Sequence, residues 1–269
     1  MTTRAWRVPE AYTGERLAAA DARFAPDMAR HLAAYEIVAP MVAGKRVLEA
    51  GCGEGYGAAI LAGRAREVVG VDYDADALAL ARRRHRAPNL EFRAVDLLEL
   101  ARDGRGEFDA VTNFQVLEHL ADPGPFLSAA AACLRPGGTL ILTTPNRRAT
   151  VSENPYHVHE YTAEELAAVL ARSFATVEVR GIVGSERVYA FERARGAHVR
   201  RILRLDPLGL RNVLPQRLVR WVFARLALLV RSRVAARDAT LVELAPSDFA
   251  IADREPPQWL DLLAIARRG

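Results

Sequence analysis

The chain has 269 residues, about half of them apolar, which is enough to bury one sizeable core with additions. It has two cysteines, no signal-peptide pattern and no run of eighteen uncharged apolar residues, which argues against a disulfide-rich secreted domain and a membrane-spanning helix and predicts a cytoplasmic protein. The net charge is +4, but residues 193–237 carry twelve arginines and one acid, so the basic character belongs to one segment and does not indicate a general nucleic-acid surface.

Residues 1–43 are expected to form a leader and a helix over a ligand pocket. Apolar residues recur at helical spacing from Met28 to Val42, which predicts an amphipathic helix over 27–43. His31 and Tyr35 on this helix either reach the pocket or pack in the core.

The stretch from Lys45 to Asp72 reads as a strand, a glycine loop over 49–55, a helix, and a second strand that ends in an acid. Glycines allow a ligand to contact the backbone, and the N–H groups that begin the helix point at that ligand. An acid about twenty residues later suits the hydroxyls of a ribose. The pattern therefore predicts the first half of a doubly wound nucleotide-binding fold.

Two ligands fit this loop. Gly53, Gly55 and Ala58 have the spacing of a dinucleotide site, which favours NAD. Glu49 and Glu54 would face a pyrophosphate, whereas the sulfonium and amine of S-adenosylmethionine favour nearby negative charge.

The run E-A-G-C-G-E-G-Y-G, residues 49–57, resembles motif I of class I S-adenosylmethionine-dependent methyltransferases. Further segments resemble the family's later landmarks in order, over residues 44–184; these are Asp72, Val95-Asp96-Leu97, Phe108-Asp109-Ala110-Val111 and Leu134-Arg135-Pro136-Gly137-Gly138. The resemblance implies a Rossmann-like sheet of seven strands and S-adenosylmethionine as cofactor. The cofactor-binding residues that it implies are Glu49, Gly51, Cys52, Gly53, Tyr56, Asp72, Tyr73, Asp96, Leu97, Asn113 and Phe114.

Candidate catalytic residues follow the fourth predicted strand, 108–114, where open α/β sheets bind ligands. Glu118 and His119 match an E-H pair of methyltransferases similar to those of quinone biosynthesis. Some of those bind a divalent ion through a further carboxylate, but Gln115 stands about where it would be, so no metal is expected.

A long polar loop follows the fifth predicted strand, from Pro145 to Tyr161. Loops of this length at a ligand edge are usually functional, and a capping box at Thr162 fixes the start of the next helix. The loop resembles a segment of bacterial methyltransferases that act on sugar hydroxyls. His157 and His159 should point to opposite faces, and we expect one of them to be the general base, with His119 and Glu118 next.

The remaining chain is predicted to hold a sixth strand over 175–183, an arginine-rich helical insertion over 185–250 and a last strand within 251–269. The insertion has four interpretations: a packed helical cap, a substrate lid, a homodimer surface, or a peripheral membrane contact through residues 195–240.

The expected function is methyl transfer from S-adenosylmethionine to a hydroxyl of a sugar or glycan, including a polysaccharide or glycolipid precursor. A quinone-like or other small-molecule hydroxyl is the alternative acceptor, and an NAD-dependent oxidoreductase is the alternative class. The N-P-Y run 154–156 follows the fifth strand rather than the fourth, which disfavours methylation of nucleic-acid amines.

Overall fold

The computed structural model describes residues 25–102, 104–150, 154–204, 222, 225–226, 243–252 and 259–269. They form two compact units. The larger unit holds the sheet and comprises Arg30–Thr150, His157–Ser185 and Ala245–Gly269. The described part of the smaller unit comprises residues 25–29, residues 154–156, the helix α6 (Glu186–Leu203), residues 222 and 225–226, and residues 243–244.

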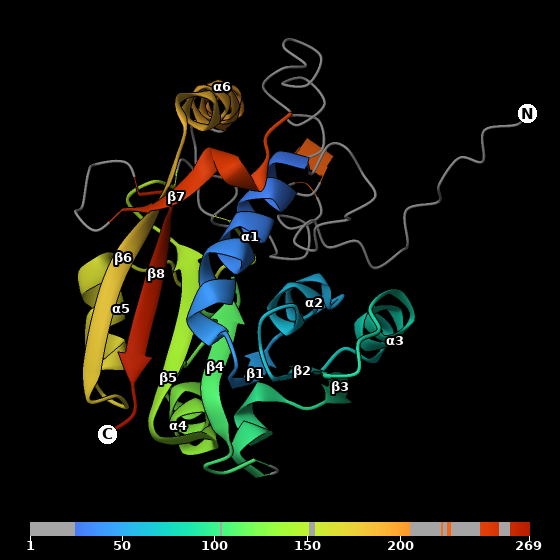
Figure 1. Cartoon of the computed structure of the whole chain (residues 1–269). Helices are drawn as coiled ribbons and strands as arrows, with labels where there is room; N and C mark the ends of the chain where they lie inside the picture. Colours follow the sequence, from blue (N-terminus) through green and yellow to red (C-terminus); the bar gives the residue numbers. More distant parts are fainter. Residues whose placement is uncertain are drawn as a thin grey trace, which may run out of the picture. The chain divides into compact units, whose positions relative to one another are not determined.

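The larger unit is built on one eight-stranded sheet in the order β3-β2-β1-β4-β5-β8-β6-β7 (Figure 1). The first five strands are parallel, whereas β8 runs antiparallel to both of its neighbours, β5 and β6. The strands are β1 (Arg46–Ala50), β2 (Glu67–Asp72), β3 (Leu90–Ala94), β4 (Phe108–Phe114), β5 (Leu134–Pro145), β6 (Thr176–Gly184), β7 (Phe249–Ala252) and β8 (Asp261–Arg267).

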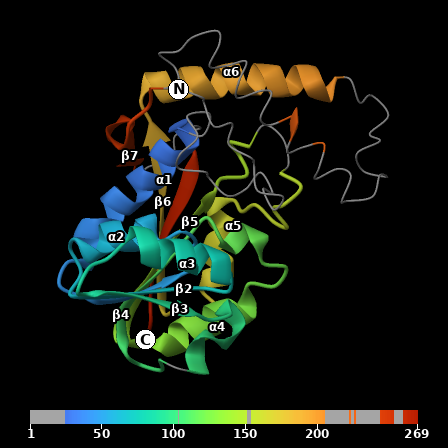
Figure 2. The same cartoon turned by 90° about the vertical axis from the view of Figure 1, so that its right-hand side faces the viewer.

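Helices cover both faces of this sheet. Figure 2 shows α1 and α2 on one side of the strands and α4 and α5 on the other. Their bounds are α1 (Ala25–Val38), α2 (Tyr56–Ala62), α3 (Ala75–Arg84), α4 (Gly124–Cys133) and α5 (Ala163–Leu170). No helix among the described ranges is both long enough and apolar enough to cross a membrane.

Local sequence signals set where two of these helices begin. The Asp74 carboxylate accepts hydrogen bonds from the backbone N–H groups of Asp76 (2.8 Å) and Ala77 (3.1 Å), which caps α3. Thr162 and Glu165 form the predicted capping box at the start of α5. The box also ends the loop after β5 at Tyr161, as the sequence predicted.

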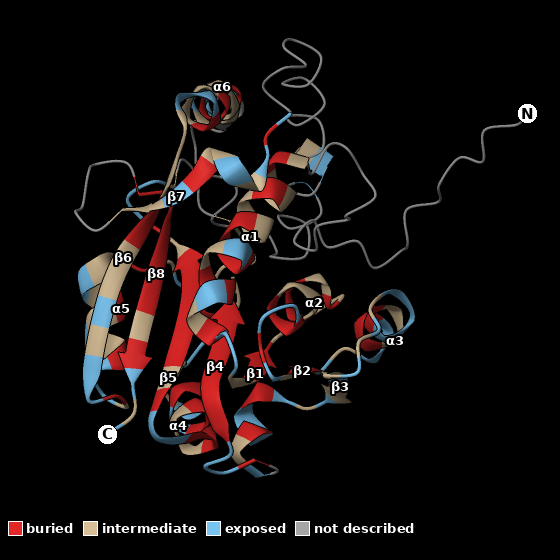
Figure 3. Cartoon of the chain, in the orientation of Figure 1, coloured by how far each residue is buried: buried red, intermediate tan, exposed pale blue. Residues whose placement is uncertain are grey.

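The core lies along the central strands (Figure 3). All seven residues of β4 are buried, because helices cover both of its faces and β1 and β5 flank it. Cys52 and Cys133 are buried and form no disulfide. Such a sheet brings the carboxyl ends of β1, β2, β4 and β5 together at one edge.

The doubly wound fold and the last strand are confirmed, but the strand count is wrong by one. The strand predicted near the C-terminus is β8, inserted between β5 and β6. The additional strand is β7, which has four residues and pairs with β6 alone at the sheet edge. So short a segment carries no periodicity that sequence analysis could recognise.

Residues 1–24, which make up most of the predicted leader, and most of the 195–240 segment lie outside the described residues. Within the smaller unit, Arg195 pairs with Asp27 (3.3 Å) and Glu192 (2.6 Å), and Arg193 pairs with Glu186 (2.5 Å). These arginines of α6 therefore have acidic partners. The predicted boundaries at 43, 184 and 250, and the roles assigned to the insertion, stay predictions.

Candidate functional site

The glycine loop leaves β1 at Ala50 and ends where α2 begins at Tyr56. Gly51, Gly53 and Gly55 all have positive φ, of 84°, 51° and 81°. A Cβ on Gly55 would lie 2.6 Å from the Phe92 ring, whereas a Cβ on Gly53 would have no atom within 4 Å. Gly53 therefore presents bare backbone to open space, as a ligand-binding loop requires.

Asp72 closes this loop from the end of β2. Its Oδ2 accepts a hydrogen bond from the Gly53 N–H (2.9 Å), and its Oδ1 accepts one from the Asp74 N–H (2.9 Å). The carboxylate is 8% exposed. The next residue, Tyr73, is 79% exposed.

Four other residues predicted to bind the cofactor lie just after β3 or at the end of β4. Asp96 accepts a hydrogen bond from the Leu98 N–H (2.9 Å), and Leu97 is largely buried. Asn113 is buried, and its side-chain amide donates to the Ala50 carbonyl (2.8 Å) at the end of β1. Phe114 is buried too. The carboxyl ends of these parallel strands thus bring the predicted set to one edge of the sheet.

Glu49, the first residue of the loop motif, is almost fully buried, at 1% exposed. Its Oε1 accepts a hydrogen bond from the Tyr35 hydroxyl (2.6 Å) on α1. The pKa of Glu49 is raised to about 8: burial is the largest cause, the Tyr35 hydrogen bond opposes it, and the nearby Asp72 adds to the rise. Sequence reasoning left the role of Tyr35 open, because nothing local relates it to Glu49.

A second network, Arg30 with Asp261, was not predicted at all. The Arg30 guanidinium binds both carboxylate oxygens of Asp261, with Nε and one terminal nitrogen each 2.5 Å from an oxygen. Gln115 donates to the same carboxylate (3.2 Å) and has φ of 55°, the one positive value among the described non-glycine residues. Strain of this kind concentrates at functional sites. The two charged residues are 231 positions apart, so no sequence motif joins them.

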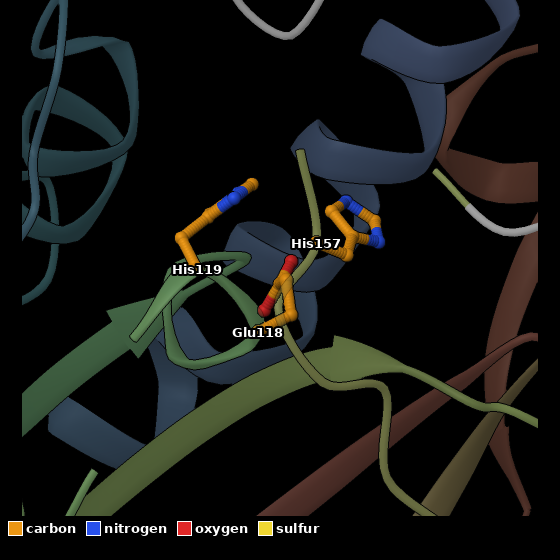
Figure 4. A group of neighbouring side chains, drawn as sticks. All are labelled: Glu118, His119 and His157. Atoms are coloured by element: carbon orange, nitrogen blue, oxygen red, sulfur yellow. The ribbon is translucent and has the colours of Figure 1, made fainter. Parts of the chain in front are cut away.

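Glu118, His119 and His157 form a cluster beside this network (Figure 4). The first two belong to the short helix η4 (Leu117–His119), and His157 comes from the loop after β5. One donor atom of each lies within 4.8 Å of the others, and the two imidazole rings meet edge to face at 5.0 Å.

Backbone hydrogen bonds fasten the loop to η4. The N–H groups of Val158 (2.7 Å) and His159 (3.2 Å) both donate to the Glu118 carbonyl. The Glu118 carboxylate is 1% exposed and accepts a hydrogen bond from the Thr144 hydroxyl (2.9 Å). Burial raises the pKa of Glu118 to about 7, against the lowering effects of His157 and Thr144.

The two loop histidines differ in their surroundings. The His157 Nδ1 is 2.6 Å from Glu160 Oε1, and both side chains are largely buried. Burial alone would raise the pKa of Glu160, but the hydrogen bonds from His157 and Thr150 outweigh it and hold that pKa below its ordinary value. His159 is 47% exposed, stacks edge-on against Tyr161 (4.6 Å) and lies 3.7 Å from Glu165.

The cluster adjoins the glycine loop. A Cβ on Gly51 would lie 2.7 Å from Cγ2 of Val116, two residues before Glu118. A ligand on the loop and a second molecule at the cluster would therefore be neighbours. The arrangement can hold a carboxylate-oriented imidazole against a group that reacts beside the loop. The same three side chains are also a donor set that a divalent cation could use.

Comparison with known proteins gives the family. A model described as "Methyltransferase domain" matches residues 20–179, more than half of the chain. A probable S-adenosylmethionine-dependent methyltransferase of Mycolicibacterium smegmatis is 43% identical over 155 residues, which cover 55% of this chain and 59% of that protein. A ubiquinone biosynthesis O-methyltransferase of Acinetobacter baumannii is 36% identical over 109 residues, 39% of this chain and 46% of that protein. The chain thus spans less than two thirds of either relative.

Solved structures agree on the fold. A possible histamine N-methyltransferase from Thermotoga maritima superposes with a TM-score of 0.58, and the aligned region covers 91% of this chain and 92% of that protein's chain. At 13% sequence identity, this likeness shows a shared architecture and nothing about the acceptor.

Proposed function

Since this chain belongs to the methyltransferase-domain family, we propose that it is an S-adenosylmethionine-dependent methyltransferase. The acceptor in this proposal is a hydroxyl group of a sugar or glycan, including a polysaccharide or glycolipid precursor. When bound, S-adenosylmethionine supplies a methyl group on a sulfonium. The residues of this chain then have three tasks: to hold the cofactor, to align the acceptor oxygen, and to take its proton.

The cofactor is held at the glycine loop in this proposal. Three features of the structure fit it: the open space over Gly53, the Asp72 carboxylate, and two buried oxygen atoms. These atoms are Oε2 of Glu49 and Oδ1 of Asn113, and no described residue donates a hydrogen bond to either of them. Buried acceptors of this kind call for donors, and the cofactor carries them.

Asp72→Ala is expected to weaken cofactor binding by roughly 1.5–3 kcal/mol, the usual worth of hydrogen bonds to a charged acceptor. The carboxylate also accepts the Gly53 N–H, so the substitution loosens the loop as well as removing a ribose contact. Calorimetry with S-adenosylhomocysteine measures the change. Unchanged affinity would remove Asp72 from the cofactor site.

The His157–Glu160 pair is the main support for the proposed methylation of a hydroxyl group, because it supplies a general base. Glu160 engages Nδ1 of His157, so the tautomer with a proton on Nδ1 leaves Nε2 as the proton acceptor. Glu118, when ionised, stabilises the imidazolium that forms once His157 has taken the proton of the acceptor hydroxyl. An alcohol needs such a base, because its neutral oxygen is a poor nucleophile.

A catalytic metal is not part of this proposal, although Glu118, His119 and His157 offer suitable donors. Prolonged dialysis against EDTA is expected to leave the methylation rate unchanged, because the imidazole acts here as a base and Gln115 supplies an amide where a further carboxylate would be needed. Loss of the rate on dialysis, with recovery on adding Mg²⁺ or Zn²⁺, would instead assign the cluster to a cation.

A quinone-type or other phenolic hydroxyl is the second candidate acceptor. It is favoured by the similarity to the ubiquinone biosynthesis O-methyltransferase, over 39% of this chain. A phenol is already acidic, so removal of His157 should matter much less for such an acceptor than for an alcohol.

Incubation with labelled S-adenosylmethionine and matched panels of sugars, glycans and catechol-like phenols tests the acceptor class. Mass spectrometry of the products should find label on a sugar hydroxyl, with a reaction that lacks the protein as the control for uncatalysed transfer. Transfer to the phenols alone would replace the sugar assignment with the quinone-type one.

A further inference from the structure

One carboxyl oxygen of Glu49 accepts a hydrogen bond from the protein, and the other receives none from the described residues. Its Oε1 accepts the Tyr35 hydroxyl at 2.6 Å. Its Oε2 is buried, and no described residue donates a hydrogen bond to it. A buried carboxyl oxygen without a donor is costly, so the site is incomplete until a donor arrives.

Tyr35 is held firmly enough to orient this carboxyl group. The phenol ring takes the space beside Gly57, where a Cβ would lie 1.9 Å from the ring. Phe114 packs edge-on against the ring at 4.4 Å, and Tyr56 does so at 5.7 Å. Tyr35 itself is 4% exposed, so its hydroxyl has little freedom to turn away from Glu49.

Neighbouring side chains of the same helix fix α1 to the sheet. Arg30 binds Asp261 at the start of β8, and it also donates to the Leu260 carbonyl (2.7 Å). His31 Nδ1 is 3.0 Å from the Tyr56 hydroxyl at the start of α2. Helix α1, which carries Tyr35, is thus held to α2 by His31 and to β8 by Arg30.

We propose that Tyr35 is a positioning residue for the cofactor: its hydroxyl holds Glu49 so that Oε2 receives the ammonium group of S-adenosylmethionine. As this ion pair forms, a proton on the Glu49 carboxyl group leaves to solvent. Tyr35 does not contact the reacting atoms. It acts through Glu49, from a helix that precedes the sheet.

The charges around Glu49 support this exchange. The titratable groups that face it are Tyr35, Cys52, Tyr56 and Asp72. Burial raises the pKa values of the two tyrosines and the cysteine, which keeps them neutral, and leaves Asp72 as the charged neighbour. Burial first, and Asp72 second, raise the pKa of Glu49 to about 8, so the carboxyl group is protonated at pH 7.

The sign of the pH dependence follows. A cation binds to the ionised form of Glu49, so cofactor affinity should rise with pH below about 8, by up to about tenfold per unit. Tyr35→Phe removes the hydrogen bond that lowers the pKa of Glu49. The variant should therefore bind roughly five- to tenfold more weakly at pH 7, with its profile displaced to higher pH.

Calorimetry with S-adenosylhomocysteine at pH 6.0–7.5, in buffers of different protonation enthalpy, measures the affinity and the number of protons released on binding. Wild-type protein should release most of a proton per cofactor bound at pH 7, and Glu49→Gln should release none. Tyr161→Phe is the matched control, since Tyr161 is a buried tyrosine on the loop after β5, and it should bind with the wild-type affinity and pH profile.

Wild-type binding without proton release would overturn the proposal, and so would a folded Tyr35→Phe variant with the wild-type affinity and profile. If Tyr35→Phe fails to fold, the comparison of wild type with Glu49→Gln still decides whether Glu49 gives up the proton. No acceptor is present in these measurements, so their failure would leave the sugar assignment untouched.

Discussion

Replacing His157 with alanine is expected to lower kcat by roughly 10²–10⁴-fold, the usual contribution of a general base. His157 is the histidine whose Nδ1 is engaged by a buried carboxylate, Glu160, at 2.6 Å. Cofactor affinity should be nearly unchanged, because the described contacts of His157 are with the acceptor-side cluster and not with the glycine loop. Single-turnover methylation of the identified acceptor measures the loss directly.

His159→Ala is the matched control. It removes the same kind of side chain two residues away, where the ring is half-exposed and lies 3.7 Å from Glu165. Its rate should remain within a few-fold of wild type. Equal losses in both variants would point to a general disturbance of the loop, and wild-type rates in both would move the base to His119 or Glu118.

The pH profile separates a base from a structural histidine. The pKa of Glu118 is raised to about 7, so its carboxyl group gains negative charge as the pH rises through neutrality. That charge stabilises the imidazolium form of His157, and the wild-type rate should rise between pH 6 and 8. The His157→Ala variant should lose this rise, since no imidazolium is formed there.

Gly53→Val is expected to abolish cofactor binding, with a loss of affinity beyond 100-fold. The φ of 51° strains any residue with a Cβ, and the side chain would enter the open space over the loop where the cofactor is proposed to lie. The substitution also disturbs the N–H that Asp72 accepts. Calorimetry with S-adenosylhomocysteine and a thermal unfolding curve give affinity and stability separately.

Gly106→Val provides the comparison for backbone strain. Gly106 has φ of 70° and no atom within 4 Å of a built Cβ, but it lies at the turn before β4, at the opposite edge of the sheet. Both variants should lose at least about 1–2 kcal/mol of stability. Only Gly53→Val should lose the cofactor; intact binding in that variant would show that the ligand space lies elsewhere.

The glycine loop and the acid that closes it could be predicted from sequence because their signals are local. Strand, glycine loop, helix and Asp72 all fall within the 28 residues from Lys45 to Asp72, and each carries its own chemical signature. The parallel strands then bring Asn113 and Phe114 to the same edge through topology alone.

The rest of the site depends on contacts between distant residues. In the sequence, Tyr35 is one more apolar position of an amphipathic helix, and only the structure shows that its hydroxyl donates a hydrogen bond to Glu49. Arg30 and Asp261 are 231 positions apart, and their pairing depends on the placement of β8. Glu160 lies in a polar loop, and its one local signal is that its carboxylate comes three residues after His157.

The position of β8 has a consequence for how the protein is made. β8 lies between β5 and β6 in the sheet but follows both of them in the chain. During synthesis from the N-terminus, β1 to β5 can assemble as a contiguous parallel layer, while β6 can pair only with the four-residue strand β7 and is not joined to β5 until residues 261–267 leave the ribosome. Asp261, the partner of Arg30, arrives with them. We therefore expect nascent chains to acquire the cofactor loop well before the acceptor edge is complete, and to expose the open edge of β5 in between.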